Sequence, residues 1–386
     1  MDTGQLARYG ALQNQVLGGE DDADHFMSSI PVADYPKRIY SFGQIKRAGK
    51  ILSEDLPDGS QTSDEVLEAF RIAHNWRMAH ALPMIVERKR LAFIAKGGFV
   101  TSGRVKRMAS IRKKLTRGST DLRQMQDLGG CRAVMPSLLT LGEVVARYTG
   151  GSTKSTMDRY SDYLSSPKSD GYRGIHLILN FEGVGQSEEF SGQKLEIQVR
   201  TRLQHSWSTA VEVIGAVLNQ DLKAGGGDDR WRLLLALMSD YYALCDGVPL
   251  RPAAPQTQSQ LCRAIREVEC ELGALAFLKA IRDSMSYYVS SPDNAWMYRL
   301  SMDSLSRTVA AYQAGKITAV NGEDYDELDE QRQTVIVSVD TARDLPRAFP
   351  NFYLDVSHFT AMLVRAVKNR KLHRTYHGAV DLPQFG

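Results

Sequence analysis

The sequence has no long hydrophobic run. Nowhere do about eighteen apolar residues follow one another, which is the least that a membrane-spanning helix requires. The stretch 1–10 also lacks the basic segment followed by an apolar segment that marks a signal peptide. We therefore expect a chain that neither crosses a membrane nor is exported, and we place it in the cytoplasm.

Cysteine is scarce as well, and the four thiols are Cys131, Cys245, Cys262 and Cys270. No two of them form a C-x-x-C pair, and no histidine lies near them at the spacing of a zinc site, which argues against a structural zinc ion. Four scattered thiols in a chain of this length favour a reducing compartment over a disulfide-linked, secreted protein.

The chain also lacks a strong charge of one sign. It has 48 Lys and Arg against 45 Asp and Glu, a net charge of +3, so any basic site must be local. Hydrophobic residues make up 43% of the chain and charged residues 24%, which is typical of a soluble globular protein. The length of 386 residues allows two or three domains with cores of their own.

The most informative stretch that the sequence does contain is an alternating run, K-L-E-I-Q-V-R-T, at Lys194–Thr201. Alternation predicts a strand whose apolar face carries Leu195, Ile197 and Val199 and whose polar face carries Glu196, Gln198 and Arg200. A carboxylate beside an arginine suits a metal-bound phosphate, because the first can bind Mg²⁺ and the second phosphoryl oxygens. Taken alone, the run is more simply explained as a solvated edge strand.

A second informative stretch, from Arg104 to Arg117, holds seven basic residues and no acid. Apolar residues at helical spacing (Met108, Ile111 and Leu115) predict an amphipathic helix. Ser110, Lys114 and Arg117 fall on another face, and Arg104 and Lys106 precede the helix on one side of an extended segment. A helix N-terminus, a hydroxyl and several cations could thus meet one phosphate chain, although a solvated basic helix face explains the run equally well.

Two further segments carry polar groups next to glycines. Asp127 precedes a short buried strand over 131–135, in which Arg132 points away from the core, and two glycines between them permit close backbone approach. The loop from Asp162 to His176 mixes Pro and Gly with Lys168, Arg173 and two tyrosines, of which Tyr172 offers a flat face for a base. The alternative is that Tyr172 plugs the domain edge and that His176 is a partly buried histidine.

The flanks are expected to be mainly helical. Ser63 is predicted to cap a helix in which Trp76 and His80 are packing neighbours. Residues 261–315 are predicted to be largely helical, 334–339 a strand and 356–368 a last helix. Because the glycine-rich break at 225–229 is the best domain boundary, we expect an N-terminal helical extension over 1–84, a central domain over 85–220 and a C-terminal region, helical and then small α/β, over 221–386.

Taken in order, these segments resemble the synthetase domain of the RelA/SpoT-type alarmone synthetases. The matching residues are Arg104, Lys106, Ser110 and Lys114, then Asp127, Gly130 and Arg132, then the loop from Asp162 to His176, and then Glu196, Gln198, Arg200 and Thr201 with Trp207 after them. The resemblance covers roughly residues 85–218. The metal-hydrolase signature of larger family members is absent, so the chain resembles a long stand-alone synthetase.

The resemblance implies an α+β fold, a mixed β-sheet flanked by helices, with helical extensions at both ends. It also implies transfer of the β,γ-pyrophosphate of ATP to the 3′-hydroxyl of GDP or GTP, which makes (p)ppGpp and releases AMP. In that reading Asp127 and Glu196 hold Mg²⁺, and Glu196 is also the general base. Arg104, Lys106, Ser110, Lys114 and Arg132 would bind ATP, whereas Lys168, Tyr172, His176, Gln198 and Arg200 would bind the acceptor.

Two departures from the family pattern leave alternatives open. Gly174 stands where the family usually has Ser, and the carboxylate after Trp207 lies one residue later than in compact members, so Glu212 receives no role. The chain could instead be a toxic relative that pyrophosphorylates the 3′ end of tRNA or makes (p)ppApp, with an antitoxin or a second copy of itself as partner. The basic runs at 88–90 and 112–114 favour that alternative. A third alternative is an inactive nucleotide-sensing module.

Overall fold

The computed structural model describes residues 32–54, 63–118, 120–151, 153–283, 286–289, 297–303, 308–313, 332–370 and 372. Residues 1–31 and 55–62 of the predicted N-terminal extension therefore lie outside the described residues. The chain is built around one sheet of nine strands in the order β3-β4-β5-β2-β1-β9-β7-β8-β6. The strands are β1 Val100–Val105, β2 Gly129–Met135, β3 Thr156–Asp162, β4 Ile175–Asn180, β5 Lys194–Thr201, β6 Ser286–Val289, β7 Tyr298–Asp303, β8 Thr308–Gln313 and β9 Arg332–Ser338.

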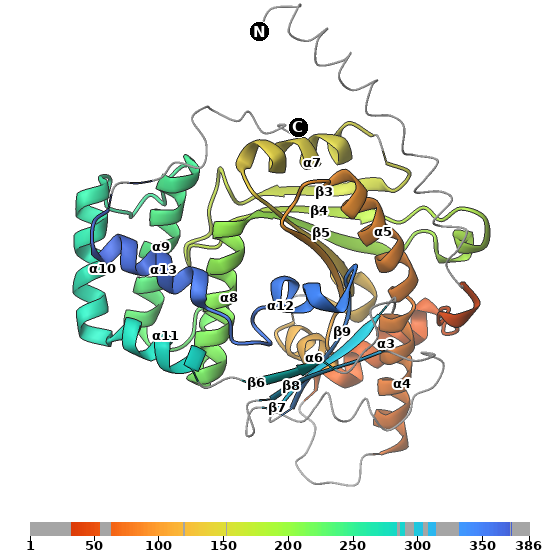
Figure 1. The fold of residues 1–386 in the computed structure, drawn as a ribbon. Coiled ribbons are helices and arrows are strands. Elements are labelled where there is room, and N and C mark those ends of the chain that lie inside the picture. The colour runs from red at the N-terminus through yellow and green to blue at the C-terminus, as the bar shows by residue number, and fades with distance from the viewer. Residues whose placement is uncertain are drawn as a thin grey trace, which may run out of the picture.

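Helices cover this sheet from several sides (Figure 1). The N-terminal and central helices are α3 Phe42–Ser53, α4 Asp64–Met78, α5 Ala81–Ile94, α6 Met108–Thr116, α7 Leu138–Thr149 and α8 Arg202–Val217. The C-terminal helices are α9 Asp229–Asp246, α10 Gln258–Leu272, α11 Ala274–Asp283, α12 Leu345–Ala348 and α13 Ser357–Val367. Strands β2 and β5 pair in parallel, whereas β4 and β5 pair antiparallel, so the sheet is mixed. The predicted fold class, α+β with a mixed sheet flanked by helices, is confirmed.

The alternating run forms β5 as predicted, with the same bounds. Leu195, Ile197 and Val199 are fully buried in the core beneath α5 and α7, because every second side chain of a strand points to the same face. Glu196 and Gln198 lie half-buried on the opposite face. Central β5 is thus flanked by β4 and β2, and its polar side chains face the same side as those of its neighbours.

The local helix predictions are also confirmed. Ser63 caps α4 by accepting a hydrogen bond from the Val66 amide. The rings of Trp76 and His80 lie edge to face with their centroids 4.6 Å apart. In α6 the buried residues are the three of the predicted apolar stripe, and they pack in one core with residues of α3 and α4. Helices α3 and α4 thereby pack against the apolar side of the basic helix α6.

The C-terminal region differs from the sequence prediction in one part. Residues 258–283 form α10 and α11, but 286–289, 297–303 and 308–313 form strands, so the prediction of a largely helical 261–315 is wrong there. These strands and β9 continue the central sheet, because Arg104 of β1 pairs with Val337 of β9. Long-range strand pairing outweighed a local helical pattern. The two domain boundaries stay predictions, and the sheet contains strands from both sides of the one at 220.

The break at 225–229 follows a short 3-10 helix, Leu222–Ala224, in the connection between α8 and α9, which pack against each other. Gly225 adopts a left-handed conformation, with φ of 83°, and Asp228 caps α9 by accepting from the amides of Arg230 and Trp231. The Trp207 Nε1 of α8 donates to the Leu235 carbonyl of α9 at 2.7 Å, which ties the two helices together. Among the described residues, no helix has the length and apolar character needed to cross a bilayer.

Candidate active site

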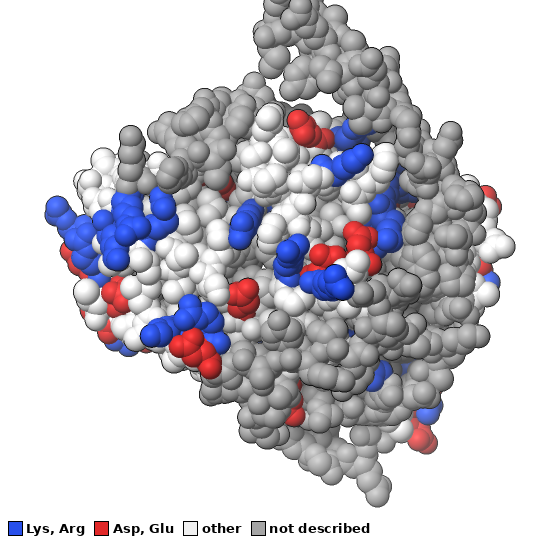
Figure 2. All heavy atoms as spheres, in the orientation of Figure 1, with Lys and Arg blue, Asp and Glu red and all other residues white. Residues whose placement is uncertain are grey.

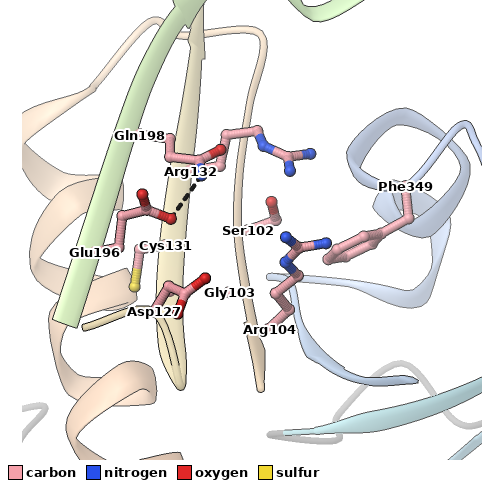
Figure 3. Close-up of a pocket in the computed structure, with 10 residues that line it drawn as sticks. Ser102, Gly103, Arg104, Asp127, Cys131, Arg132, Glu196, Gln198 and Phe349 are labelled. Atoms are coloured by element: carbon pink, nitrogen blue, oxygen red, sulfur yellow. Dashed lines mark hydrogen bonds between the residues drawn. The ribbon is translucent and has the colours of Figure 1, made fainter. Parts of the chain in front are cut away.

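The polar face of the sheet forms a pocket where β1, β2 and β5 lie side by side (Figure 3). Each of these strands contributes side chains from its polar face, and one aromatic residue comes from the C-terminal region. The lining residues are Ser102, Gly103, Arg104, Asp127, Gly130, Cys131, Arg132, Glu196, Gln198 and Phe349. Of the twelve predicted site residues, five line this pocket and the other seven, which include Ser110 in the first turn of α6, lie outside its lining.

The two predicted acidic residues come together in this pocket. Gly130 of β2 pairs with Glu196 of β5, and Asp127 lies just before β2, so both carboxylates point into the same space (Figure 3). Asp127 accepts from Lys106 Nζ at 2.6 Å and from Lys114 Nζ at 3.1 Å. Burial alone would raise the pKa of Asp127, but the two lysines lower it, and the charge of Glu196 partly opposes them. The two carboxylates therefore interact electrostatically.

Glu196 is held by two neighbours on the sheet. Its Oε1 lies 2.8 Å from His176 Nδ1, and its Oε2 accepts from Gln198 Nε2 at 2.7 Å. Burial would raise the pKa of Glu196, but His176, Gln198 and Arg104 together lower it to about 2. The carboxylate is therefore ionised at neutral pH and fixed in orientation.

Three arginines, Arg104, Arg132 and Arg200, lie around this carboxylate pair, and not all of their hydrogen-bond donors have partners in the described part of the chain. Burial, Arg200 and Arg104 lower the pKa of Arg132 to about 9. The Nε atoms of Arg132 and Arg200 are buried and have no hydrogen-bond partner in the described part of the chain. Buried donors without partners are costly, so this cluster is suited to an anion or a planar acceptor that would complete it.

The glycine-flanked loop reaches the same face through Tyr172. The Tyr172 hydroxyl contacts His176 Nε2 and accepts from Arg200 Nη2, which lies 2.7 Å away. The Lys168 ammonium lies 5.1 Å from the centre of the Tyr172 ring, and the Trp207 ring lies edge-on at 6.4 Å. The five predicted acceptor residues thus form one connected group, because Gln198 also accepts from Arg200 at 2.9 Å.

Gly174 has a physical reason to be glycine in this structure. Its φ is +149°, and a Cβ there would lie 3.2 Å from Arg200 Cγ. A serine would therefore push against the side chain of Arg200, which here lies directly over the glycine. The departure from the family pattern goes together with the position of Arg200.

Sequence reasoning missed three residues at this site. Ser102 lies on β1, a strand that the sequence did not predict because V-T-S-G-R-V neither alternates clearly nor is strongly apolar. Phe349 follows α12 and lies beside Arg104 (Figure 3), although nothing in its local sequence indicates a site. Glu212 was set aside for its spacing. Burial opposes the ionisation of Glu212, yet Lys223, Arg104 and Arg132 lower its pKa. The Glu212 carboxylate therefore interacts electrostatically with two of the arginines at the site.

Five of the six residues in the basic runs that favoured an RNA substrate, all but Arg112, form ion pairs within the described part of the chain. Arg88 is buried and, with Lys89, contacts Asp340, whereas Arg90 contacts Glu87. In the second run Lys113 pairs with Asp221 and Lys114 with Asp127. Basic and acidic side chains are interspersed over the described part of the face in Figure 2.

The donor set fits a magnesium ion shared with substrate. Mg²⁺ is usually bound by one or two carboxylates together with substrate phosphates and water, and Asp127 and Glu196 supply two carboxylates to one pocket. The described residues contain no cluster of three or more His, Cys, Asp or Glu that would hold a metal ion by itself. The chemistry of the site therefore suits an ion that arrives with a polyphosphate.

Comparisons with known proteins match the segment of the chain that contains these residues. Residues 103–213 match the family model described as the region found in RelA / SpoT proteins. The chain is 34% identical over 117 residues to GTP pyrophosphokinase YjbM of Bacillus subtilis, which covers 29% of this chain and 53% of that protein. It is 28% identical over 128 residues to GTP pyrophosphokinase YwaC of the same organism, or 32% of this chain and 60% of that protein.

The chain thus spans just over half the length of these curated relatives. Among solved structures, the small alarmone synthetase 1 from Bacillus subtilis superposes with a TM-score of 0.38 and 26% identity, over 48% of this chain and 94% of that one. All twelve predicted site residues fall within the matched segment. This chain therefore carries, at residues 103–213, a region of the RelA/SpoT family.

Proposed function

We propose that this region is an ATP-dependent pyrophosphotransferase that moves the β,γ-pyrophosphate of ATP to the ribose 3′-hydroxyl of GDP or GTP. One observation carries the proposal: Asp127 and Glu196 face a single pocket that Arg104 and Arg132 also line. Paired carboxylates suit a divalent ion, and incompletely paired guanidinium groups suit the phosphates and base that come with it. The names of the relatives, which are GTP pyrophosphokinases, support the same reaction class.

On the acceptor side, Glu196 is the general base. It takes the proton from the 3′-hydroxyl as that oxygen forms its bond to the β-phosphorus, and the bond from the β-phosphorus to the oxygen of the α-phosphate breaks, so AMP leaves. A carboxylate with a pKa of about 2 is a weak base. Phosphoryl transfer through a loose transition state needs little proton abstraction before the transition state is reached. The orientation that His176 and Gln198 give to the Glu196 carboxylate therefore matters more than the basicity of that carboxylate.

On the donor side, Arg104 and Arg132 bind the adenine between their guanidinium planes, and Lys106, Lys114 and Ser110 bind the phosphates. Asp127 and Glu196 would hold Mg²⁺, which when bound neutralises the charge of the phosphate oxygens. Lys106 and Lys114 already contact Asp127, so they stand where a polyphosphate bound near this carboxylate would meet two ammonium groups.

The acceptor nucleotide binds to the group formed by Tyr172, Lys168, His176, Gln198 and Arg200. Tyr172 provides a ring for the base, which would share that ring with the Lys168 ammonium. Arg200 and Lys168 provide positive charge for the acceptor phosphates. We place the reaction in the cytoplasm, where its nucleotide substrates are found.

The test is a transfer assay with γ-labelled ATP and Mg²⁺, in which GDP, GTP, ADP and bulk tRNA are offered in turn. Label in a guanosine tetra- or pentaphosphate supports the proposal. Label on tRNA or in an adenosine product would replace it with the toxic-relative alternative, which the pairing of the basic runs within the protein disfavours. No transfer to any acceptor, with ATP binding retained, would identify an inactive sensing module.

A further inference from the structure

The loop 163–174 between β3 and β4 carries the proposed acceptor residues Lys168 and Tyr172 and is called the acceptor loop here. It is held from behind by helix α9, which lies outside the matched region 103–213. Gly171 packs so closely on α9 that an added Cβ would lie 2.9 Å from Ser239 Cβ and 3.3 Å from Ala236 Cα. Its φ of +96° also disfavours any side chain there. The Ser239 hydroxyl donates to the Gly171 carbonyl, so the loop backbone is bonded to the helix at this point.

Arg173 is the second link between the loop and the helix. Its side chain is 3% exposed, and its Nη2 lies 3.3 Å from Asp240 Oδ1. Its Nε donates to Ser239 Oγ at 3.1 Å, and its Nη1 donates to the carbonyl of Pro249 at 2.7 Å. The guanidinium therefore points away from the pocket and into a polar cluster at the back of the loop.

Asp240 is the centre of this cluster. Its side chain is fully buried, and besides Arg173 it accepts from Arg251, whose Nη2 and Nε lie 2.7 and 3.0 Å from Oδ2. Arg251 in turn donates through Nη1 to the carbonyl of Ser169 at 3.0 Å. One buried carboxylate thus orients two arginines, and each arginine holds a different point of the loop.

Tyr172 lies between two of these fixed points. Its neighbours, Gly171 and Arg173, are both attached to α9, while its own hydroxyl contacts His176 and Arg200 on the opposite side. The direction of the Tyr172 ring is therefore set by the attachment of the residues on either side of it. A loop fixed in this way has little conformational entropy left to lose when a nucleotide binds.

We infer that Asp240, acting through Arg173 and Arg251, is a positioning residue for the acceptor nucleotide. This inference rests on the proposed function and deepens it, since it assigns part of the acceptor specificity to a helix outside the family-model match at 103–213. Asp240 touches neither substrate. It sets the loop that does, so its loss acts on the acceptor and leaves the donor side, on α6 and β1, unaffected.

The test compares Michaelis constants for the two substrates in Asp240→Asn and Arg251→Met. Asparagine keeps the volume of Asp240 but removes its charge, and Arg251→Met removes only the link to Ser169 and one partner of Asp240. We expect the acceptor KM to rise about tenfold in Asp240→Asn and less in Arg251→Met, with the ATP KM unchanged. Equal increases in both constants, or an unchanged acceptor KM, would overturn the inference.

A matched control separates positioning from general stability. Asp246 is another buried carboxylate of α9, and it accepts from Thr201 Oγ1 and Gln204 Nε2 at the start of α8, whereas Asp240 accepts from the arginines that hold the loop. Asp246→Asn should lower the melting temperature without a selective rise in the acceptor KM. If it reproduces the kinetic effect of Asp240→Asn, the role of Asp240 is only structural.

Hydrogen exchange of the loop gives a readout that does not need catalysis. The amides of residues 163–174 should exchange faster in Asp240→Asn and Arg251→Met than in the unaltered protein, whereas those of α6 should not change. Unchanged exchange in the loop would contradict the positioning role even if the chain transfers pyrophosphate to none of the acceptors. A failed transfer assay with faster loop exchange would instead reject the proposed function and retain the link between α9 and the loop.

Discussion

His176 Nδ1 lies 2.8 Å from Glu196 Oε1, across the antiparallel ladder that joins β4 to β5. The two residues are diagonal neighbours, because His176 pairs with Gln198 and Ile178 pairs with Glu196 in the register. The His176 ring is tied in turn to the Tyr172 hydroxyl. The acceptor loop and the carboxylate are therefore linked by one imidazole, so acceptor binding and the orientation of the base are not independent.

Replacement of Glu196 by Gln tests the proposed base. The amide has nearly the shape of the carboxylate but cannot accept a proton, so we expect transfer to fall by a factor of about 10² to 10⁴. ATP binding in the absence of Mg²⁺ should change little, because the base and phosphates contact other residues in the proposal. The measurement is label transfer under saturating substrates, together with calorimetric ATP binding. Turnover close to that of the unaltered protein would remove Glu196 from the mechanism.

Replacement of His176 by Ala should change the pH dependence of turnover. In the unaltered protein the low pKa of Glu196, about 2, keeps the base ionised across the whole range in which the protein can be assayed. Burial acts to raise that pKa, and the His176 hydrogen bond is the largest effect that opposes it. Without the imidazole the pKa rises, so the carboxylate becomes protonated at a higher pH and activity is lost sooner as the pH falls.

The measurement for His176→Ala is kcat at saturating acceptor between pH 4 and pH 8. We expect an acidic limb to enter this range in His176→Ala, whereas the unaltered protein should show no loss of activity from protonation of Glu196 between pH 4 and pH 8. Saturating acceptor is needed because His176 also belongs to the proposed acceptor group. Parallel pH profiles in the two proteins would show that His176 does not control the ionisation of Glu196.

Replacement of Arg132 by Met should separate stability from binding. Burial and the charges of Arg200 and Arg104 lower the pKa of Arg132 to about 9, so its charge is unfavourable in the folded, unliganded protein at neutral pH. Methionine removes that charge, and replacing a strained buried charge by an apolar side chain stabilises by about 1 kcal/mol or more. The same change removes a guanidinium from the proposed adenine site, so the ATP KM should rise about tenfold.

Thermal unfolding with and without ATP and Mg²⁺ checks both parts of this prediction. Arg132→Met should melt at a higher temperature than the unaltered protein when unliganded, and ATP should raise that temperature by less. A variant that melts lower and still binds ATP normally would indicate that Arg132 is a structural residue. Arg200→Met is not a suitable control, because Arg200 also contacts Tyr172 and Gln198.

Local patterns predicted much of the sheet face and of the basic helix. The alternation in 194–201 gives the strand and its two faces, because side-chain direction in a strand is set residue by residue. The apolar stripe of α6 likewise identifies the buried residues Met108, Ile111 and Leu115. What these patterns could not give is which carboxylate meets which, since Asp127 and Glu196 approach only through the pairing of β2 with β5.

Local sequence patterns could not predict the residues that the C-terminal region contributes, for the same reason. Phe349 and Asp240 lie outside any recognisable motif. Phe349 reaches the pocket because β9 pairs with β1, and Asp240 lies behind the acceptor loop because α9 packs on α8. Strand β1 was missed because its glycine, Gly103, interrupts the apolar pattern. That glycine is needed where a Cβ would lie 2.2 Å from Met84 Sδ of α5. Helix α5 can therefore pack closely on β1 because position 103 is a glycine, and the same glycine removes the alternating pattern that would have predicted the strand.

Replacement of Phe349 by Leu tests whether the C-terminal region completes the donor pocket. Phe349 is 3% exposed and lies beside Arg104 at the edge of the pocket, opposite Glu196 and Gln198 (Figure 3). Leucine fills much of the volume, so the fold should persist, but it lacks the flat face that can pack against a guanidinium or a base. Loss of such a face costs about 0.5–1.5 kcal/mol, so the ATP KM should rise by a factor of about 2 to 10 while the acceptor KM stays the same.

The direction of the change in Phe349→Leu distinguishes two roles for this segment. A higher ATP KM means that Phe349 forms part of the wall against which the donor binds. A lower ATP KM would contradict this prediction and would mean that the ring instead occupies space that the donor needs. Phe352→Leu is a suitable control, because Phe352 is also buried in the C-terminal core, at 5% exposure, but does not line the pocket. It should change the melting temperature and leave both Michaelis constants as they are, so an equal effect of the two variants would show that the kinetic change reports only the packing of this region.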